Sequence, residues 1–202
     1  PSNSSTIDAS NVDAVRGGFE NAPLTAFSQP SNRADFQAAL DRVEAELGRS
    51  YPLVVSGRDG RTEGTFDSVN PARPSQLIGT FPMAESEHVD AALDAATEAF
   101  DGWSRTPASE RAAVLFRAAD EMRSRRHWFS AWMVFEVGKS WVEADADTAE
   151  AIDFLDYYAR QMLALDRGAD LHQIQSERSE MVYLPLGVGA VILPCHFRNA
   201  SL

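Results

Sequence analysis

Carboxylate side chains are concentrated in one stretch of the chain, where they could bind a cationic group. Glu150 and Asp153 lie three residues apart in a stretch with helical periodicity, so both side chains fall on one face of the expected helix. Asp145, Asp147 and Asp156 lie close by in the same stretch. On spacing alone, this pattern favours a solvated acidic helix face over a binding site.

The single thiol is the other group that invites a chemical role. Cys195 is followed directly by His196, and an imidazole beside a thiol can activate it as a nucleophile. Adjacent residues on a strand point to opposite faces, however, and no third residue that would orient the imidazole is evident. We therefore predict that Cys195 is not catalytic. We also predict no metal site, because the histidines lack metal-ligand spacing: His88, His127, His172 and His196.

Glycines and the lone lysine have simpler interpretations. Gly187-Val-Gly189 is only part of a phosphate-loop pattern, so these glycines are expected at packing or turn positions. Lys139 is the only lysine and is predicted to be a helix-end cation or a salt-bridge partner. The tryptophans are expected to anchor a core or an interface: Trp103, Trp128, Trp132 and Trp141.

Composition limits the class of protein. The 202 residues are enough for one or two domains, and 44% of them are apolar, as in a globular protein. The formal net charge of −12 argues against non-specific binding to nucleic acid or to an anionic membrane. One cysteine permits no internal disulfide, and no stretch approaches the roughly 18 apolar residues that span a bilayer. We therefore expect a cytoplasmic protein.

Hydrophobic periodicity predicts helices through most of the chain. Phe36, Leu40 and Val43 recur at helical spacing, and Gly48 is placed to end that helix. Ser86 can cap a second helix, and Thr106 followed by Pro107 can begin a third. Two further helices are expected near residues 128–138 and 144–165, the last with Gly168 just beyond its end.

Strands are expected in two places. Residues 51–57, 65–69 and 77–81 predict a small β meander with a turn over 58–64. The apolar runs 181–186 and 188–193 predict two more strands. The second run has no polar alternation, which is typical of a strand buried on both faces of a parallel sheet. Helices feeding a buried strand indicate the opening of an α/β domain.

Three short motifs resemble a known family. Glu-Val-Gly-Lys at 136–139, Glu-Ala-Ile-Asp-Phe at 150–154 and Tyr-Tyr-Ala at 157–159 occur in this order and at close spacing. Together they resemble the aldehyde dehydrogenase superfamily, and more narrowly its L-glutamate γ-semialdehyde (1-pyrroline-5-carboxylate) dehydrogenases. The resemblance covers roughly residues 36–197. It implies the N-terminal part of an α/β aldehyde dehydrogenase fold, with helices and first strands of a Rossmann-like cofactor domain and an oligomerisation flap.

The resemblance implies an activity and a set of site residues. The activity is NAD-dependent oxidation of a small aldehyde, L-glutamate γ-semialdehyde, to L-glutamate in proline catabolism, by a homo-oligomer. Glu150 then matches a substrate residue that meets the α-ammonium group, and Phe197 an aromatic residue beside the aldehyde chain. The oxyanion-donor position of the family falls on His196. The residues expected to face NAD are Ile192, Leu193, Pro194, Cys195 and His196.

The segment Pro194-Cys-His-Phe197 departs from the family pattern Pro-Trp-Asn-Phe. Cys195 stands at the family's tryptophan, His196 at its asparagine, and Arg198 where proline is usual. An altered terminus and a variant subfamily both remain as explanations, and we favour the first. The family's nucleophilic cysteine and general-base glutamate belong to a later segment, so the 202-residue chain by itself is expected to be inactive.

The expected layout has four parts. Residues 1–34 form a flexible arm, and 35–175 form the helical part of an NAD-binding domain with the meander at 51–81. Residues 176–187 form a flap strand, and 188–202 form the first cofactor-facing strand and a truncated end. Two alternatives to a dehydrogenase segment stay open: a non-catalytic assembly or binding module, and a truncated gene product with an exposed core.

Overall fold

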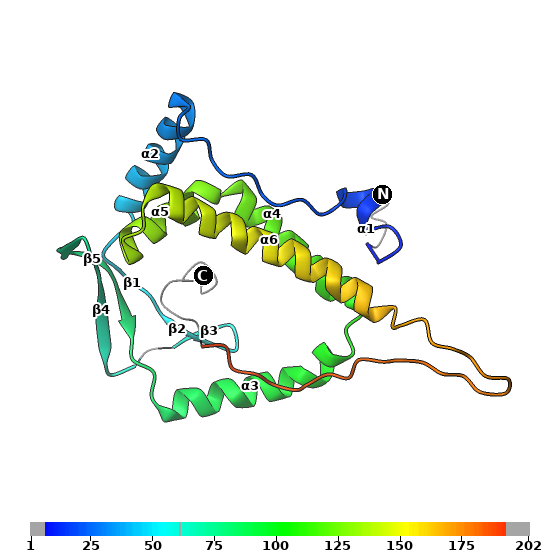
Figure 1. Cartoon of the computed structure of the whole chain (residues 1–202). Coiled ribbons are helices and arrows are strands. Elements are labelled where there is room, and N and C mark those ends of the chain that lie inside the picture. Colours follow the sequence, from blue (N-terminus) through cyan, green and yellow to red (C-terminus); the bar gives the residue numbers. More distant parts are fainter. Residues whose placement is uncertain (1–6, 61, 193–202) are drawn as a thin grey trace, which may run out of the picture.

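A computed structural model describes residues 7–60 and 62–192 of the chain. Helices dominate it, and α4, α5 and α6 lie together, while α3 runs apart from them and next to β2 (Figure 1). The helices are α1 (Val12–Arg16), α2 (Pro30–Glu44), α3 (Ser86–Ser104), α4 (Ala108–Ser124), α5 (Arg126–Val137) and α6 (Trp141–Asp166). The strands are β1 (Arg49–Ser50), β2 (Leu53–Val55), β3 (Arg58–Gly60), β4 (Thr65–Asn70) and β5 (Arg73–Pro82).

One core cluster joins α2, β5 and α5. Phe36, Leu40 and Val43 are buried on one face of α2, as their helical spacing predicts. They pack with Ile78 of β5 and Trp132 of α5, and the ring of Phe36 is fully buried. Burying a side chain of this size contributes about 2–3 kcal/mol through the apolar area removed from water. This cluster fixes the start of the helical bundle against the sheet.

A second cluster joins α1, α4 and α6. Ala112 and Phe116 of α4 pack with Ala159 and Leu163 of α6, and Val12 of α1 covers them. Small alanines let α4 and α6 approach closely, and these two helices share the most extensive contact between any two helices of the described residues. Because α6 belongs to this cluster, its position is set by packing over most of its length.

The strands form a three-stranded sheet of order β1-β5-β4 and a separate hairpin of β2 and β3. β4 and β5 are antiparallel, with register shifts near Val69, and β1 lies parallel to β5 with Arg49 opposite Gly79. The turn predicted over residues 58–64 is wrong for Arg58–Gly60, which pair with β2. Ser56 and Gly57 both have positive φ, and such residues form the tight turn that allows this pairing.

The five predicted helices are all present, with small shifts of their first residues. The N-cap of α3 is Glu85 rather than Ser86, in a capping box with His88. The N-cap of α4 is Pro107 rather than Thr106. In both helices the N-cap lies one residue from the predicted N-cap, and capping signals in the sequence do not define a helix end to within one residue.

Helix α3 has an apolar face that is left uncovered within the described residues. Its apolar side chains at positions 89, 92, 93, 96 and 100 share one face, yet no residue of α3 is buried within the described part of the chain. Val89 and Leu93 are about half exposed, and so is Trp103. The amphipathic pattern therefore correctly predicts the helix but not a covered face.

The two strands predicted over 181–186 and 188–193 are absent from residues 181–192, and so is the flap strand predicted over 176–187. These residues are extended and largely exposed, with Leu184 and Leu186 open to solvent. A strand requires a hydrogen-bonded neighbour, and residues 7–60 and 62–192 place none beside this segment. An apolar run indicates that a segment can form a β-strand, but it does not indicate whether a second strand lies beside it to pair with.

The N-terminal arm lies against the helices. Residues 7–29 contain α1 and then run along α6 (Figure 1), and the flexibility expected of residues 1–34 stays a prediction. α2 begins at Pro30, before the predicted start at Asp35. The arm lacks helical or strand periodicity because side chains of the helices, not a ladder, bind its backbone. The assignment of residues 35–175 to an NAD-binding domain stays a prediction.

Candidate functional site

Helix α6 carries Glu150, the predicted substrate residue that lies within the described part of the chain. Ser140 caps its start and accepts a hydrogen bond from the Glu143 N–H at 3.3 Å, while the Glu143 carboxylate accepts one from the Ser140 N–H. The Ser140 hydroxyl also donates to the Glu143 carboxylate at 2.8 Å, and this hydrogen bond, together with the one from the Ser140 N–H, lowers the pKa of the Glu143 carboxyl. Ala149 and Ile152 are buried on the inner face of α6, which orients Glu150 outward to solvent.

Glu150 shares its exposed face with two aromatic rings. Phe154 and Tyr158 follow it at spacings of four and eight residues, and their rings stack with centroids 5.8 Å apart. Both rings are about half exposed. A carboxylate on the same helix face as exposed aromatic rings is a combination that attracts an ammonium group, through direct charge and through cation–π attraction. This face of α6 could thus bind a primary ammonium ion.

Asp153 does not join Glu150 in this role. Its carboxylate accepts hydrogen bonds from the Ala22 N–H at 2.7 Å and from the Asn21 side-chain amide at 2.8 Å. The two carboxylates that the spacing placed on one face therefore have different functions in the structure. Glu150 is open to solvent, and Asp153 holds the N-terminal arm.

The neighbouring carboxylates do not form the solvated acidic face that spacing favoured. Asp145 is almost completely buried and pairs with Arg126 at 2.7 Å, and Asp156 is buried and pairs with Arg160 at 2.6 Å. Asp147 pairs with Lys139, which confirms the salt-bridge interpretation of the lone lysine. Buried carboxylates need such partners, because desolvation of an unpaired charge is costly.

Three of the four tryptophans belong to the core, as predicted. Trp132 is buried in the first core cluster, and Trp128 and Trp141 pack against that cluster. Trp103, near the end of α3, is 52% exposed, and its role as an interface anchor stays a prediction. The indole N–H groups of Trp128 and Trp132 are buried without a hydrogen-bond acceptor in the part of the chain that the structure describes.

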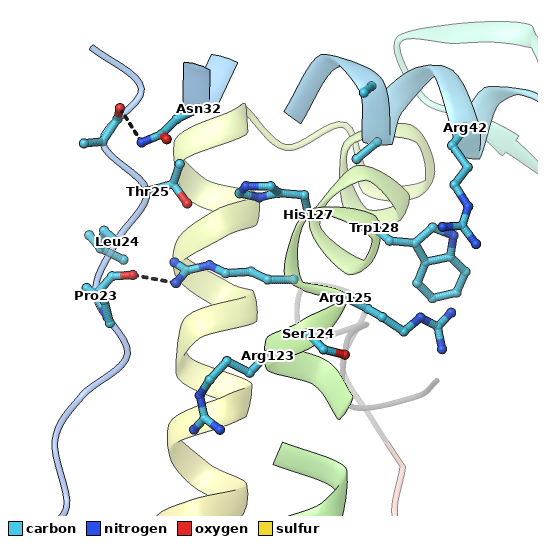
Figure 2. A pocket seen from close by; sticks show the side chains of 14 residues that line it. Pro23, Leu24, Thr25, Asn32, Arg42, Arg123, Ser124, Arg125, His127 and Trp128 are labelled. Carbon is cyan, nitrogen blue, oxygen red and sulfur yellow. Dashed lines mark hydrogen bonds between the residues drawn. The ribbon is translucent and has the colours of Figure 1, made fainter. Parts of the chain in front are cut away.

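An open groove of about 710 Å³ lies where the arm passes the junction of α4 and α5 (Figure 2). It is rich in arginine, yet its guanidinium groups have internal partners. Arg126 donates to the Pro23 carbonyl and to Asp145, and Arg125 lies over the Trp128 ring at 4.1 Å. The groove is lined by Pro23, Leu24, Thr25, Ala26, Asn32, Ala38, Ala39, Arg42, Arg123, Ser124, Arg125, Arg126, His127 and Trp128.

The environment of His127 in this groove favours the neutral form of its imidazole. Burial lowers the pKa of its imidazole from the ordinary value of 6.5, and the nearby Asp145 only partly opposes that shift. Its ring meets Phe36 edge-on, with centroids 5.5 Å apart. The groove therefore lies where Arg126 joins the arm to the helices.

Most of the residues predicted to face the cofactor lie outside the described part of the chain. Leu193, Pro194, Cys195, His196 and Phe197 fall outside the described residues, so their roles stay predictions. Ile192 is described and is 93% exposed. Gly187 and Gly189 have open space where a side chain would begin. Residues 7–60 and 62–192 contain no group of three His, Cys, Asp or Glu side chains that could hold a metal ion.

Comparison with known proteins places the chain in a family. The Aldehyde dehydrogenase family matches residues 58–198, which is more than half of the chain. This chain belongs to the aldehyde dehydrogenase family. The predicted fold class, the N-terminal part of an aldehyde dehydrogenase fold, is thereby confirmed.

Named relatives narrow the similarity further. The chain is 50% identical over 184 residues to 1-pyrroline-5-carboxylate dehydrogenase of Geobacillus thermodenitrificans, covering 91% of this chain and 36% of the relative. Identity to 1-pyrroline-5-carboxylate dehydrogenase 2 of Bacillus subtilis is 46%, with the same coverage. A crystal structure of the Thermus 1-pyrroline-5-carboxylate dehydrogenase with bound NAD superposes with a TM-score of 0.86 at 41% identity, covering 91% of this chain and 36% of that one. The chain thus spans about a third of the length of these relatives.

Sequence reasoning missed the residues that bind the arm. Asp145, Asp153 and Arg160 do so from α6, and Arg126 does so from the start of α5. The available signal was the excess of carboxylates on a helix that also has a buried face. Their partners lie more than a hundred residues away in the sequence, so no local spacing reveals the pairing.

No helix within the described residues is long and apolar enough to cross a membrane.

Proposed function

We propose that this chain acts as the N-terminal segment of an NAD-dependent dehydrogenase that oxidises L-glutamate γ-semialdehyde (1-pyrroline-5-carboxylate) to L-glutamate in proline catabolism. The observation that carries this proposal is 50% identity over 91% of the chain to a 1-pyrroline-5-carboxylate dehydrogenase. The Thermus relative with bound NAD supports the choice of cofactor. A cytoplasmic location and a homo-oligomeric state belong to the same proposal.

Glu150 is the residue we propose for substrate contact. Its exposed carboxylate beside Phe154 and Tyr158 suits the ammonium group of an amino-acid aldehyde. The cofactor would supply the hydride acceptor of the oxidation, and the segment 192–196 is proposed to face it. Glu150 would bind and orient the substrate and would transfer no proton.

The first test measures activity in two settings. The 202-residue chain alone is expected to produce no NADH from 1-pyrroline-5-carboxylate and NAD, since the relatives it matches are roughly two and a half times its length. A hybrid in which residues 7–192 replace the aligned segment of the Geobacillus thermodenitrificans enzyme is expected to be active. An inactive but folded hybrid would contradict the proposed function.

The second test separates binding from turnover in that hybrid. Glu150→Gln removes the charge and should raise the KM for 1-pyrroline-5-carboxylate about tenfold, the effect of losing a hydrogen bond between charged groups, with a smaller change in kcat. Asp166→Asn, at the exposed end of the same helix, is the matched control and should leave KM unchanged. Equal changes in KM for the two substitutions would contradict the proposal that Glu150 contacts the substrate.

Assembly is a second candidate function that one observation favours. α3 is an amphipathic helix of 19 residues with no buried residue in the part of the chain that the structure describes. We infer that its apolar face, which includes Val89 and Leu93, is a contact surface of an oligomer. Sedimentation of the pure chain tests this, and a monomer at all concentrations would argue against it.

A further inference from the structure

The arm between α1 and α2 is bound to the helices through its backbone. The Ala22 N–H donates to Asp153 and the Thr25 N–H donates to Asp145, each at 2.7 Å. The Gly17 carbonyl accepts from Arg160 at 2.9 Å, and the Pro23 carbonyl accepts from Arg126. Four charged side chains therefore bind four backbone groups within nine residues of arm.

The spacing of these contacts fits an extended segment on a helix. Asp145, Asp153 and Arg160 bind Thr25, Ala22 and Gly17 in that order, so the arm runs antiparallel to α6. Eight residues of extended chain span roughly 26 Å, and the fifteen residues of α6 between the outer contacts span roughly 22 Å. The two lengths match closely enough for all the contacts to form together.

The arm has no other regular support. Residues 18–24 make no backbone–backbone hydrogen bond within the described ranges 7–60 and 62–192. Phe19 adds one edge-on ring contact with Tyr157 of α6, at 5.3 Å between centroids. Attachment of the segment thus depends mainly on hydrogen bonds to charged side chains, which are stronger than neutral ones but few in number.

We propose that residues 17–26 form a strap that detaches from α6 as one cooperative unit, at a lower free energy than unfolding of the helices beneath it. The contacts are linked because each one shortens the free chain between its neighbours, so loss of one weakens the next. The helices under the strap are held independently by the two core clusters. Detachment would uncover Tyr157 and the carboxylates of Asp145 and Asp153 while the bundle stays folded.

Residue-resolved amide hydrogen exchange on the full chain tests this proposal. Asp153→Asn weakens the contact at Ala22, and exchange is read at the neighbouring contact of the strap, at the Thr25 amide. Thr25→Val removes a hydroxyl that donates to Asp145 at 2.7 Å, and exchange is then read at the Ala22 amide. Each substitution should speed exchange at the contact that it does not alter about tenfold, with the Ile152 amide in α6 unchanged.

Thr80→Val is the matched control for Thr25→Val. It removes a hydroxyl-to-carboxylate hydrogen bond of similar length, from Thr80 to Asp67 at 2.6 Å, in the sheet. It should leave exchange across the strap unchanged. Faster exchange only at the residue next to each substitution would show local fraying and overturn the proposal. Equally accelerated exchange at Ile152 would show global unfolding and overturn it too, and Thr25→Val decides alone if Asp153→Asn does not fold.

Discussion

Arg126 and Asp145 form an ion pair whose loss should be costly. The guanidinium donates two hydrogen bonds to the carboxylate, at 2.7 and 2.8 Å, and the exposed fractions of the two side chains are 15% and 2%. Arg126→Met fills similar space but leaves a buried carboxylate with only the two donors of Thr25. Breaking a buried pair costs about 3–5 kcal/mol. Because those two donors remain, we expect the lower end, about 3 kcal/mol.

The assay is thermal and urea unfolding of the variant. In a chain of this size a loss of about 3 kcal/mol lowers the Tm by roughly 6–12 °C. Arg105→Met is the matched control, because Arg105 pairs with Asp101 where both side chains are more than two-thirds exposed, and it should cost less than about 1 kcal/mol. The double variant with Asp145→Asn should be more stable than Arg126→Met alone, since no buried charge is then unpaired. Equal losses for Arg126→Met and Arg105→Met would refute the reasoning.

Two further predictions concern backbone strain and pH. Gly138→Ala should destabilise the chain by about 1–3 kcal/mol, because Gly138 ends α5 with φ of 74° and an added Cβ would lie 3.0 Å from Pro71. Gly102→Ala, inside α3 with open space around it, should instead stabilise by up to about 1 kcal/mol in the same unfolding assay. Burial lowers the pKa of His127 in the fold, so the unfolded chain binds more protons below pH 6.5, and stability should fall as pH drops through that value. His127→Gln should flatten that part of the stability–pH curve, and an unchanged curve would contradict the assignment.

Much of the helical fold could be predicted from the sequence. The spacing of Phe36, Leu40 and Val43 predicts both α2 and its buried face, and the face is buried as expected. The long helix α6 was predicted to start near Ala144, although Ser140 and Glu143 form a capping box that is legible in the sequence. These features are local, so a pattern over a few residues is enough to reveal them.

The features that could not be predicted from the sequence depend on contacts between residues that are distant along the chain. The apolar run ending at Ile192 has the composition of a strand, but within the described residues no neighbouring strand pairs with it. Asp145 and Asp153 resemble a solvated acidic face until the arm, about 120–131 residues earlier, is placed on them. The family resemblance is what singled out Glu150 as a substrate residue. The structure shows that Glu150 is exposed on the same face of α6 as Phe154 and Tyr158.

The attachment of the arm to α6 has a consequence during synthesis of the protein. Thr25 leaves the ribosome 120 residues before Asp145, so at ordinary rates of translation it waits roughly 6–24 s for the carboxylate that binds it. During this interval the segment has no docking site, while α2 and the strands can already begin to pack. Residues 17–30 contain two glycines and two prolines, which disfavour the strand pairing through which exposed segments associate. The glycines and prolines of the arm thus suit a segment that is made early and docked late.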